Sequence, residues 1–202
     1  MTINTQSTVL VCRRIEQVPF ELRLQESSEG PQEVGTLEAI KVKILMLGDD
    51  VAPQSLRIEL ASENDLFFHY MHVVDETGYR NLQEQQKLMV EYIEYPNVLI
   101  KMLNNCIKEP HSHLAVFIMQ HDGQARLEFI QNLSYKFVEL LTCNFGRSPD
   151  ELVRQQITYR YNALKSRLAI MQARLQDVNQ LVKVKNPSLL LKLNNGKSPR
   201  RR

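Results

Sequence analysis

The sequence is poor in the residues that build small catalytic or metal sites, since its 202 residues include three cysteines, seven glycines and no tryptophan. Cys12, Cys106 and Cys143 are odd in number and far apart, which argues against a disulfide framework and excludes a C-x-x-C metal site. The glycines form no phosphate-binding loop, and neither a G-x-S-x-G nor an H-E-x-x-H motif occurs. We therefore expect buried, reduced thiols in a protein that is not an enzyme and needs no cofactor.

Long hydrophobic runs are also missing. No apolar segment approaches the ~20 residues that cross a bilayer. The first residues, Met1–Asn4, lack the basic and apolar segments of a secretory signal. The sequence therefore predicts a soluble protein of the cytoplasm with no membrane partner.

Two pairs of histidines in the sequence raise the question of a metal site. His69 lies near His72, and His111 lies near His113. Because no thiol and no second carboxylate accompanies either pair, we do not predict a metal site.

Acidic residues are absent from the last stretch, 183–202, which carries seven Lys or Arg. The remainder, 1–182, carries 18 basic and 23 acidic residues, so the basic character belongs to the C-terminal end. We divide the chain into a globular head (1–147), a coiled-coil helix (148–186) and a basic, disordered tail (187–202). The tail is expected to stay in solvent, with an acidic protein surface or nucleic acid as alternative partners.

The head contains a series of strand patterns. Alternating or continuous apolar residues predict strands at 8–12, 20–24, 37–47, 56–60 and 66–74. An apolar run at 113–119 and the Asp122-Gly123 turn signal predict a hairpin with 125–130, followed by a strand at 135–145.

Two helices are expected between these strands. Asp75 or Thr77 would cap the first, whose apolar face continues through Leu88, Met89 and Tyr92. Pro96 fits the start of the second helix, which runs to Cys106. The fold class is therefore α+β, with an antiparallel β-sandwich or barrel head, a helical insertion and a long C-terminal helix.

The third helix is predicted to begin at Ser148, where Glu151 completes a capping box and Pro149 fits the first helical position. Beyond it, apolar residues recur at alternating spacings of four and three, a set that we name the seam: Ile157, Tyr161, Leu164, Leu168, Met171, Leu175, Val178 and Val182. This heptad pattern predicts a parallel coiled-coil homodimer about 39 Å long. The alternative is a helix folded back on its own head, which usually shows a wider apolar face.

The charges beside the seam give the dimer little support. Arg160, Arg167 and Arg174 occupy heptad position g, and no acidic residue occupies the facing e positions at 158, 165 and 172. Surface ion pairs contribute only about 0–1 kcal/mol, so their absence does not forbid pairing. We therefore expect a weak coiled coil.

The stretch between the aromatic strand and the second helix is the most distinctive part of the chain. On these residues the chain resembles the head domain of the spindle assembly abnormal protein 6 family of centriole proteins: Glu63, Asp65, Phe67, Phe68, Tyr70, Glu76, Tyr79, Leu82, Gln85, Gln86, Leu88, Val90, Glu91, Tyr92, Tyr95, Pro96, Leu99, Ile100, Leu103 and Cys106.

The resemblance implies that heads associate through an aromatic residue at a hairpin tip, which enters a pocket on a neighbouring head. It places Tyr135 at that position, followed by Lys136, whereas the family usually has phenylalanine there. Tyrosine keeps most of the apolar area, but its hydroxyl needs a partner. In the alternative interpretation, Tyr135 packs inside its own domain.

The function implied is a self-assembling structural protein of the centriole or basal body, or of a related flagellar or apical cytoskeletal structure. Its expected partners are other centriolar or flagellar proteins, with tubulin as an alternative partner of the basic tail. In the family the closed assembly is a ninefold cartwheel hub. The heptads stop after Val182, whereas the family has a far longer coiled coil, so the chain is either trimmed or one of the short, spindle-assembly-six-like relatives. The basic residues that run to the last position favour the short relative. The alternatives are a DNA-repair scaffold of the ligase-partner type, which shares the head and coiled coil, and a monomeric adaptor with a partner-binding helix.

Overall fold

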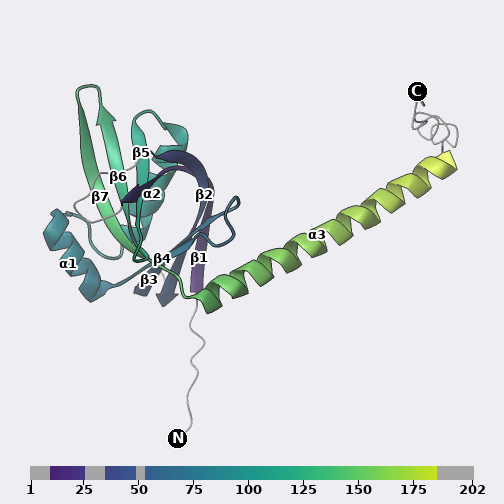
Figure 1. Cartoon of the computed structure of the whole chain (residues 1–202), viewed down its shortest axis with the longest axis horizontal. Coiled ribbons are helices and arrows are strands. Elements are labelled where there is room, and N and C mark those ends of the chain that lie inside the picture. The colour runs from purple at the N-terminus through teal and green to yellow at the C-terminus, as the bar shows by residue number, and fades with distance from the viewer. Residues whose placement is uncertain (1–9, 26–34, 49–52, 186–202) are drawn as a thin grey trace, which may run out of the picture. The chain divides into compact units, whose positions relative to one another are not determined.

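The computed structural model describes residues 10–25, 35–48 and 53–185. The chain forms two compact units, Met1–Asp150 and Glu151–Arg202. We refer to the described part of the first as the head and to that of the second as the stalk (Figure 1). The basic tail predicted at 187–202 lies outside the described residues.

In the described part of the head, two successive helices lie between a group of four strands and a group of three, and the stalk is a helix. In chain order the elements are β1 Leu10–Gln25, β2 Thr36–Gly48, β3 Pro53–Ser62, β4 His69–Asp75, α1 Glu76–Gln86, α2 Tyr95–Lys108, β5 His113–Gln120, β6 Gln124–Leu133, β7 Lys136–Arg147 and α3 Asp150–Lys185. The prediction of a β head with a helical insertion, followed by a long C-terminal helix, is confirmed.

The strands close into a barrel in the order β1-β2-β3-β4-β7-β6-β5. Neighbouring strands are antiparallel, except that the second half of β1 runs parallel to β5, from Phe20 beside Ala115 to Gln25 beside Gln120. This parallel pair joins the first strand to the middle of the chain and so closes the sheet.

The first strand differs from the prediction of two short strands. β1 is continuous, with a register shift between Ile15 and Val18 where Gln17 has a positive φ of 60°. The shift is a β-bulge, which bends a strand without ending it. The polar residues between the two apolar runs therefore mark a bend in one strand and not a turn.

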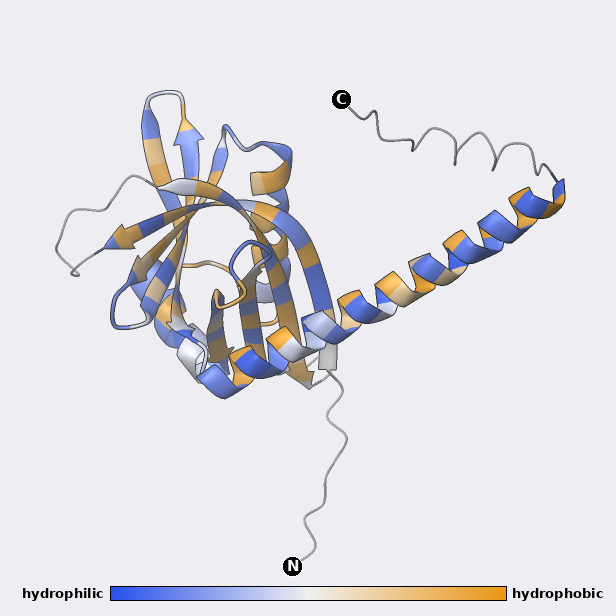
Figure 2. Cartoon of the chain, turned by 45° about the vertical axis from the view of Figure 1, so that its right-hand side comes forward, coloured by the Kyte–Doolittle hydropathy of each residue, from blue (hydrophilic) through white to orange (hydrophobic). Residues whose placement is uncertain are grey.

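The core follows from alternation along the strands. Ile40, Val42 and Ile44 of β2 are at most 1% exposed, whereas the lysines between them are only partly buried. Figure 2 shows this alternation as bands of orange and blue along the strands. Aromatic rings fill the centre: Phe117 lies 5.1 Å from Tyr70 and 5.7 Å from Phe145 between ring centroids.

Helix α1 begins as predicted but is shorter. The Asp75 carboxylate accepts a hydrogen bond from the Gly78 amide at 2.7 Å, and the helix ends before Lys87, whose φ of 55° is left-handed. The predicted continuation through Met89 is wrong, since Met89 is 98% exposed. The loop that follows α1 is fixed to this helix, because the Tyr79 hydroxyl donates a hydrogen bond to the Val90 carbonyl at 2.6 Å.

Helix α2 packs its buried face on β1 and β5. Pro96 lies in the first turn, as predicted, and Leu99, Leu103 and Cys106 are at most 2% exposed. The first turns of the helix, at Pro96, Asn97 and Ile100, also line the hollow described below.

The start of α3 also differs from the prediction. The helix begins at Asp150, and the Ser148 hydroxyl lies 2.7 Å from His69 Nδ1, while the Glu151 carboxylate accepts from Gln155. Ser148 therefore links β4 to the end of β7, a role different from the predicted capping box.

Candidate self-association surfaces

The β6–β7 hairpin presents aromatic side chains to solvent at its tip. Leu133 pairs with Lys136, so Ser134 and Tyr135 form the turn. Tyr135 is 87% exposed and Lys136 is also exposed. The alternative in which Tyr135 packs inside its own domain is therefore wrong, as is its placement inside the last strand.

A second aromatic residue at the tip was missed from the sequence. Phe137 is 63% exposed and follows Tyr135 by two residues, the interval at which strand side chains share a face. Two exposed aromatic rings at the end of one hairpin give the tip enough apolar area to act as an anchor. The signal was present in the sequence as the alternation Tyr135-Lys136-Phe137.

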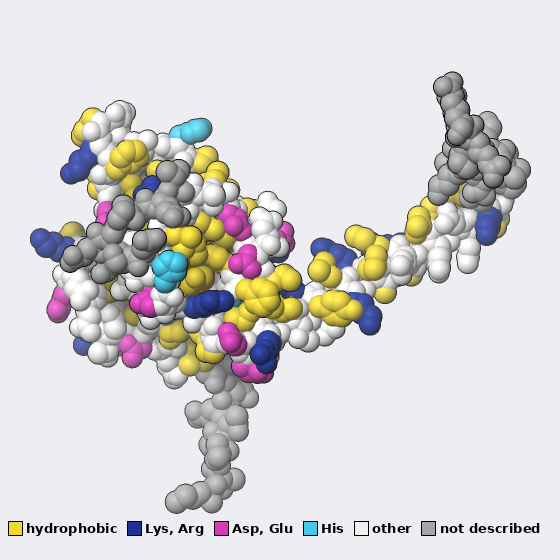
Figure 3. All heavy atoms as spheres, in the orientation of Figure 1, with side chains coloured by type: hydrophobic (Ala, Val, Ile, Leu, Met, Phe, Trp, Pro, Cys, Tyr) yellow, Lys and Arg dark blue, Asp and Glu magenta, His cyan; other side chains and the backbone are white. Residues whose placement is uncertain are grey.

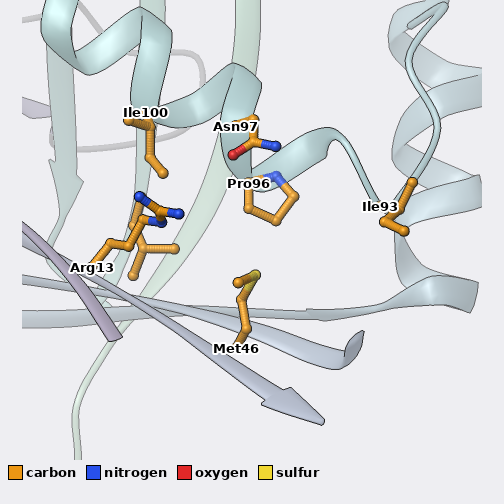
Figure 4. A pocket seen from close by; sticks show the side chains of 7 residues that line it. Arg13, Met46, Ile93, Pro96, Asn97 and Ile100 are labelled. Atoms are coloured by element: carbon orange, nitrogen blue, oxygen red, sulfur yellow. The ribbon is translucent and has the colours of Figure 1, made fainter. Parts of the chain in front are cut away.

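The head also has a hollow at its surface, between α2 and the strands β1 and β2. It has a volume of about 130 Å³ and is lined by Arg13, Ile44, Met46, Ile93, Pro96, Asn97 and Ile100. Figure 4 shows Arg13 and Met46 on the strand side, Pro96, Asn97 and Ile100 on the helix side, and Ile93 at one end. The lining combines apolar side chains with the guanidinium of Arg13 and the amide of Asn97, so the hollow offers both apolar and polar surface.

The size of the hollow suits an aromatic ring. An apolar cavity of about 150 Å³ accepts a benzene molecule in a protein interior. Because its lining comes from three separate elements, no local sequence pattern could have identified it. The hollow and the hairpin tip are distinct features of the same head.

The seam runs along the stalk without a cover in the single chain. Tyr161, Leu164, Leu168, Met171, Leu175 and Val178 are each between 53% and 65% exposed. Ile157 and Val182, at the two ends, are intermediate. The predicted apolar stripe therefore exists on a real helix, and it needs a partner to leave water.

Histidines of both sequence pairs lie beside polar groups of the head. His72 Nδ1 lies 2.6 Å from the Asn144 carbonyl oxygen, and burial lowers the pKa of this imidazole below its ordinary value of 6.5. His113 Nδ1 lies 3.6 Å from the Glu109 carboxylate. Within the described residues, no group of three or more His, Cys, Asp or Glu is arranged to hold a metal ion.

The thiols divide into one exposed and two buried groups. Cys12 is exposed, whereas burial raises the pKa of Cys106 to about 11 and that of Cys143 to about 12. The Tyr95 hydroxyl lies 3.3 Å from Cys143 Sγ inside the core. Two of the three cysteines therefore behave as core residues.

None of the described helices is both long enough and apolar enough to span a membrane.

Comparison with known proteins places these features in a family. The model of the centriolar protein SAS N-terminal domain matches residues 15–145. The spindle assembly abnormal protein 6 homolog of Gallus gallus is 28% identical over 100 residues, which cover 50% of this chain and 16% of the chicken protein. The chain therefore spans less than two thirds of the length of this relative.

Solved structures share the fold. An N-terminal fragment of Leishmania SAS-6 with parts of its coiled coil domain, a point mutant, superposes with a TM-score of 0.68 at 15% identity, covering 92% of this chain and 99% of that one. A Drosophila melanogaster Sas-6 fragment, described as dimerised via the coiled-coil domain, gives 0.63 at 15% identity, with 97% of each chain covered. Because the family model covers well over half of the chain, this protein belongs to the centriolar SAS N-terminal domain family.

Proposed function

We propose that this protein is a structural, self-assembling scaffold of the centriole or basal body, of the cartwheel type, and not an enzyme. The observation that carries the proposal is the exposure of Tyr135, 87%, at a hairpin tip of a head that belongs to the centriolar family. Together with the exposed Phe137, it gives the tip two aromatic rings in water, which favours a contact with another molecule.

The first contact joins heads. Tyr135 of one head enters the hollow of a second head, where Met46, Pro96 and Ile100 surround the ring. The tyrosine hydroxyl reaches Asn97 or Arg13 at the margin, which satisfies the one polar group that phenylalanine would lack. Phe137 packs beside the entrance and excludes water.

The second contact joins stalks. Two copies of α3 pair in parallel along the seam, as a coiled coil buries its a and d residues. The coiled-coil dimer described for the Drosophila relative supports this assignment. The arginines at g gain no acidic partner in the homodimer, so the pairing rests on apolar burial alone.

Two different contacts on one chain determine the assembly. The stalk contact is two-fold and closes on itself, whereas the head contact joins each dimer to the next. Repetition of the head contact at a fixed angle gives a ring when it closes and a helical filament when it does not. The assembly of the family favours the ring, and the centriole, basal body or flagellar base is the expected location.

The experiment that tests the head contact is the substitution Tyr135→Glu, made in a Leu168→Asp background so that the stalks do not contribute. Burying a carboxylate in the hollow costs several kcal/mol, so association of heads should weaken by about 100-fold or more. Sedimentation velocity over a wide concentration range measures the change.

The matched control is Leu37→Glu, which adds the same charge at another exposed apolar residue, 77% exposed. This control should associate as the Leu168→Asp parent does. If Tyr135→Glu and Leu37→Glu give the same association constant, the hairpin tip is not the head contact.

A further inference from the structure

The stalk has a second line of apolar and small side chains that the seam does not include. We name Tyr159, Ala163, Ser166, Ile170 and Ala173 the outer stripe. Their spacings of four, three, four and three are again those of a heptad, at positions f and c. Because f and c lie on the side of the helix away from a and d, a dimer formed along the seam leaves the outer stripe in solvent.

The outer stripe is exposed, and the sizes of its side chains suit the packing of a second helix against it. Tyr159 is 62% exposed and Ile170 is 54% exposed. The other three members of the stripe, Ala163, Ser166 and Ala173, are small. Small residues allow a neighbouring helix to approach closely, with the two large side chains as anchors about 16 Å apart. Outward positions of a coiled coil are usually charged or polar, so this composition needs an explanation.

A row of cations runs beside the outer stripe. Arg160, Arg167 and Arg174 each follow a residue at position f, and no acidic residue occurs between Glu151 and Asp177. Figure 3 shows dark blue side chains interspersed with yellow ones along the stalk. Any helix that lies in the stripe therefore meets positive charge along one flank.

The charge distinguishes between two kinds of occupant. A second copy of α3 would bring its own arginines against these arginines, which is unfavourable. An acidic helix would place carboxylates opposite them, and each exposed pair would contribute about 0–1 kcal/mol in a salt-dependent way.

We propose that the outer stripe is a docking site for an acidic, amphipathic helix of another protein, with Tyr159 and Ile170 as its apolar anchors. The bound helix lies along the outside of the stalk dimer and leaves the seam intact. This site is separate from both self-association contacts, so a scaffold can carry a partner without losing its own assembly.

The test uses the full chain and a fluorescent synthetic peptide of about four heptads, with leucine and alanine on one face and glutamate on the flanking positions. We expect saturable binding that weakens by about tenfold or more in Tyr159→Ala/Ile170→Ala and on raising the salt from about 50 to about 500 mM. Alanine keeps the helix, as circular dichroism would verify. A peptide with lysine in place of glutamate should not bind.

Sedimentation provides the control on the seam. Neither the peptide nor Tyr159→Ala/Ile170→Ala should change the self-association of the chain, because neither touches the a and d residues. The proposal is overturned if the double variant binds the peptide as tightly as the parent does. It is equally overturned if the peptide dissociates the stalk dimer, which would place it on the seam, or if the double variant alone lowers the oligomer mass, which would make the stripe a contact between copies.

Discussion

At the scale of single residues, the tyrosine at the hairpin tip is the most informative side chain. Its apolar ring explains why it should leave water, and its hydroxyl explains which surface it should choose. The hollow offers Arg13 and Asn97 at its margin, from β1 and from α2. In the proposed complex the Tyr135 hydroxyl replaces the water around these two exposed groups, whereas phenylalanine would cover them without offering a hydrogen bond.

We expect Tyr135→Phe to weaken head association by about 3- to 10-fold, the usual contribution of one hydrogen bond. Asn97→Ala should weaken it to a similar extent, and the two changes together should cost no more than either alone, as a double-mutant cycle would show. Isothermal titration calorimetry or sedimentation in the Leu168→Asp background gives the constants. Tighter association of Tyr135→Phe would contradict a role for the hydroxyl.

His72 makes the stability of the head depend on pH. Burial lowers its pKa, and its Nδ1 bonds to the Asn144 carbonyl in the neutral form. Below about pH 6.5 the unfolded chain therefore binds a proton that the folded head resists, so stability is full above this pH and falls as the pH decreases.

Urea unfolding of the parent at several values between about pH 7.5 and 5 should show this loss, with a slope of up to about 1.4 kcal/mol per pH unit from one such group. His72→Phe should be less stable at neutral pH but should lose part of the dependence. His121→Phe is the control, because His121 is exposed and its removal should leave the slope unchanged. An unchanged slope in His72→Phe would assign the acid sensitivity to other groups.

At the scale of elements, the sequence was most informative where one period persisted. The period of two in β3, with Leu56, Ile58 and Leu60, and the heptads of α3 both predicted elements that exist. Prediction failed where a single residue redirects the backbone: Gln17 bends β1 without ending it, and Lys87 ends α1 while the apolar pattern continues. Both residues have a positive φ, which neither composition nor periodicity reveals.

The parallel pairing of β1 with β5 also could not be predicted. Phe20 and Ala115 are far apart in sequence, and the strand patterns on each side fit several partners equally well. The hollow depends on that same arrangement, since Arg13, Met46 and Pro96 meet only after the barrel has formed. The aromatic tip, in contrast, depends on one hairpin, and the resemblance to the family located it correctly at a turn.

The stalk permits a direct test of the seam. Leu168→Asp places a carboxylate at the middle a position and should cost the dimer several kcal/mol, because two charges would face each other in the apolar core. The Leu168 side chain is 57% exposed in the single chain, so the fold of one chain should be unaffected. Sedimentation equilibrium measures the dimer, and circular dichroism measures helix content.

The matched control is Ile170→Asp, two residues further on and 54% exposed, which lies in the outer stripe. It adds the same charge to the same helix but should leave the stalk dimer unchanged. If both substitutions disrupt the dimer equally, the register assigned to the seam is wrong.

At the scale of the whole molecule, the proposed assembly requires both contacts in one chain. Two reactive types of side chain in the head are held in structural contacts: Cys143 lies against Tyr95, and His69 lies against Ser148. The surface of the described head carries an exposed aromatic tip and a hollow of about 130 Å³. The chemistry of the described head therefore favours binding between copies.

Electron microscopy of the parent chain at high concentration should show closed rings or helical filaments, because dimers joined through their heads repeat without limit until they close. Tyr135→Glu should give isolated dimers, since only the stalk contact remains. Leu168→Asp should also abolish large assemblies, although its heads can still associate, because a weak contact loses the gain in effective concentration that a dimeric stalk provides. The double variant should be monomeric at every concentration, and large assemblies that persist in it would require a third contact elsewhere on the chain.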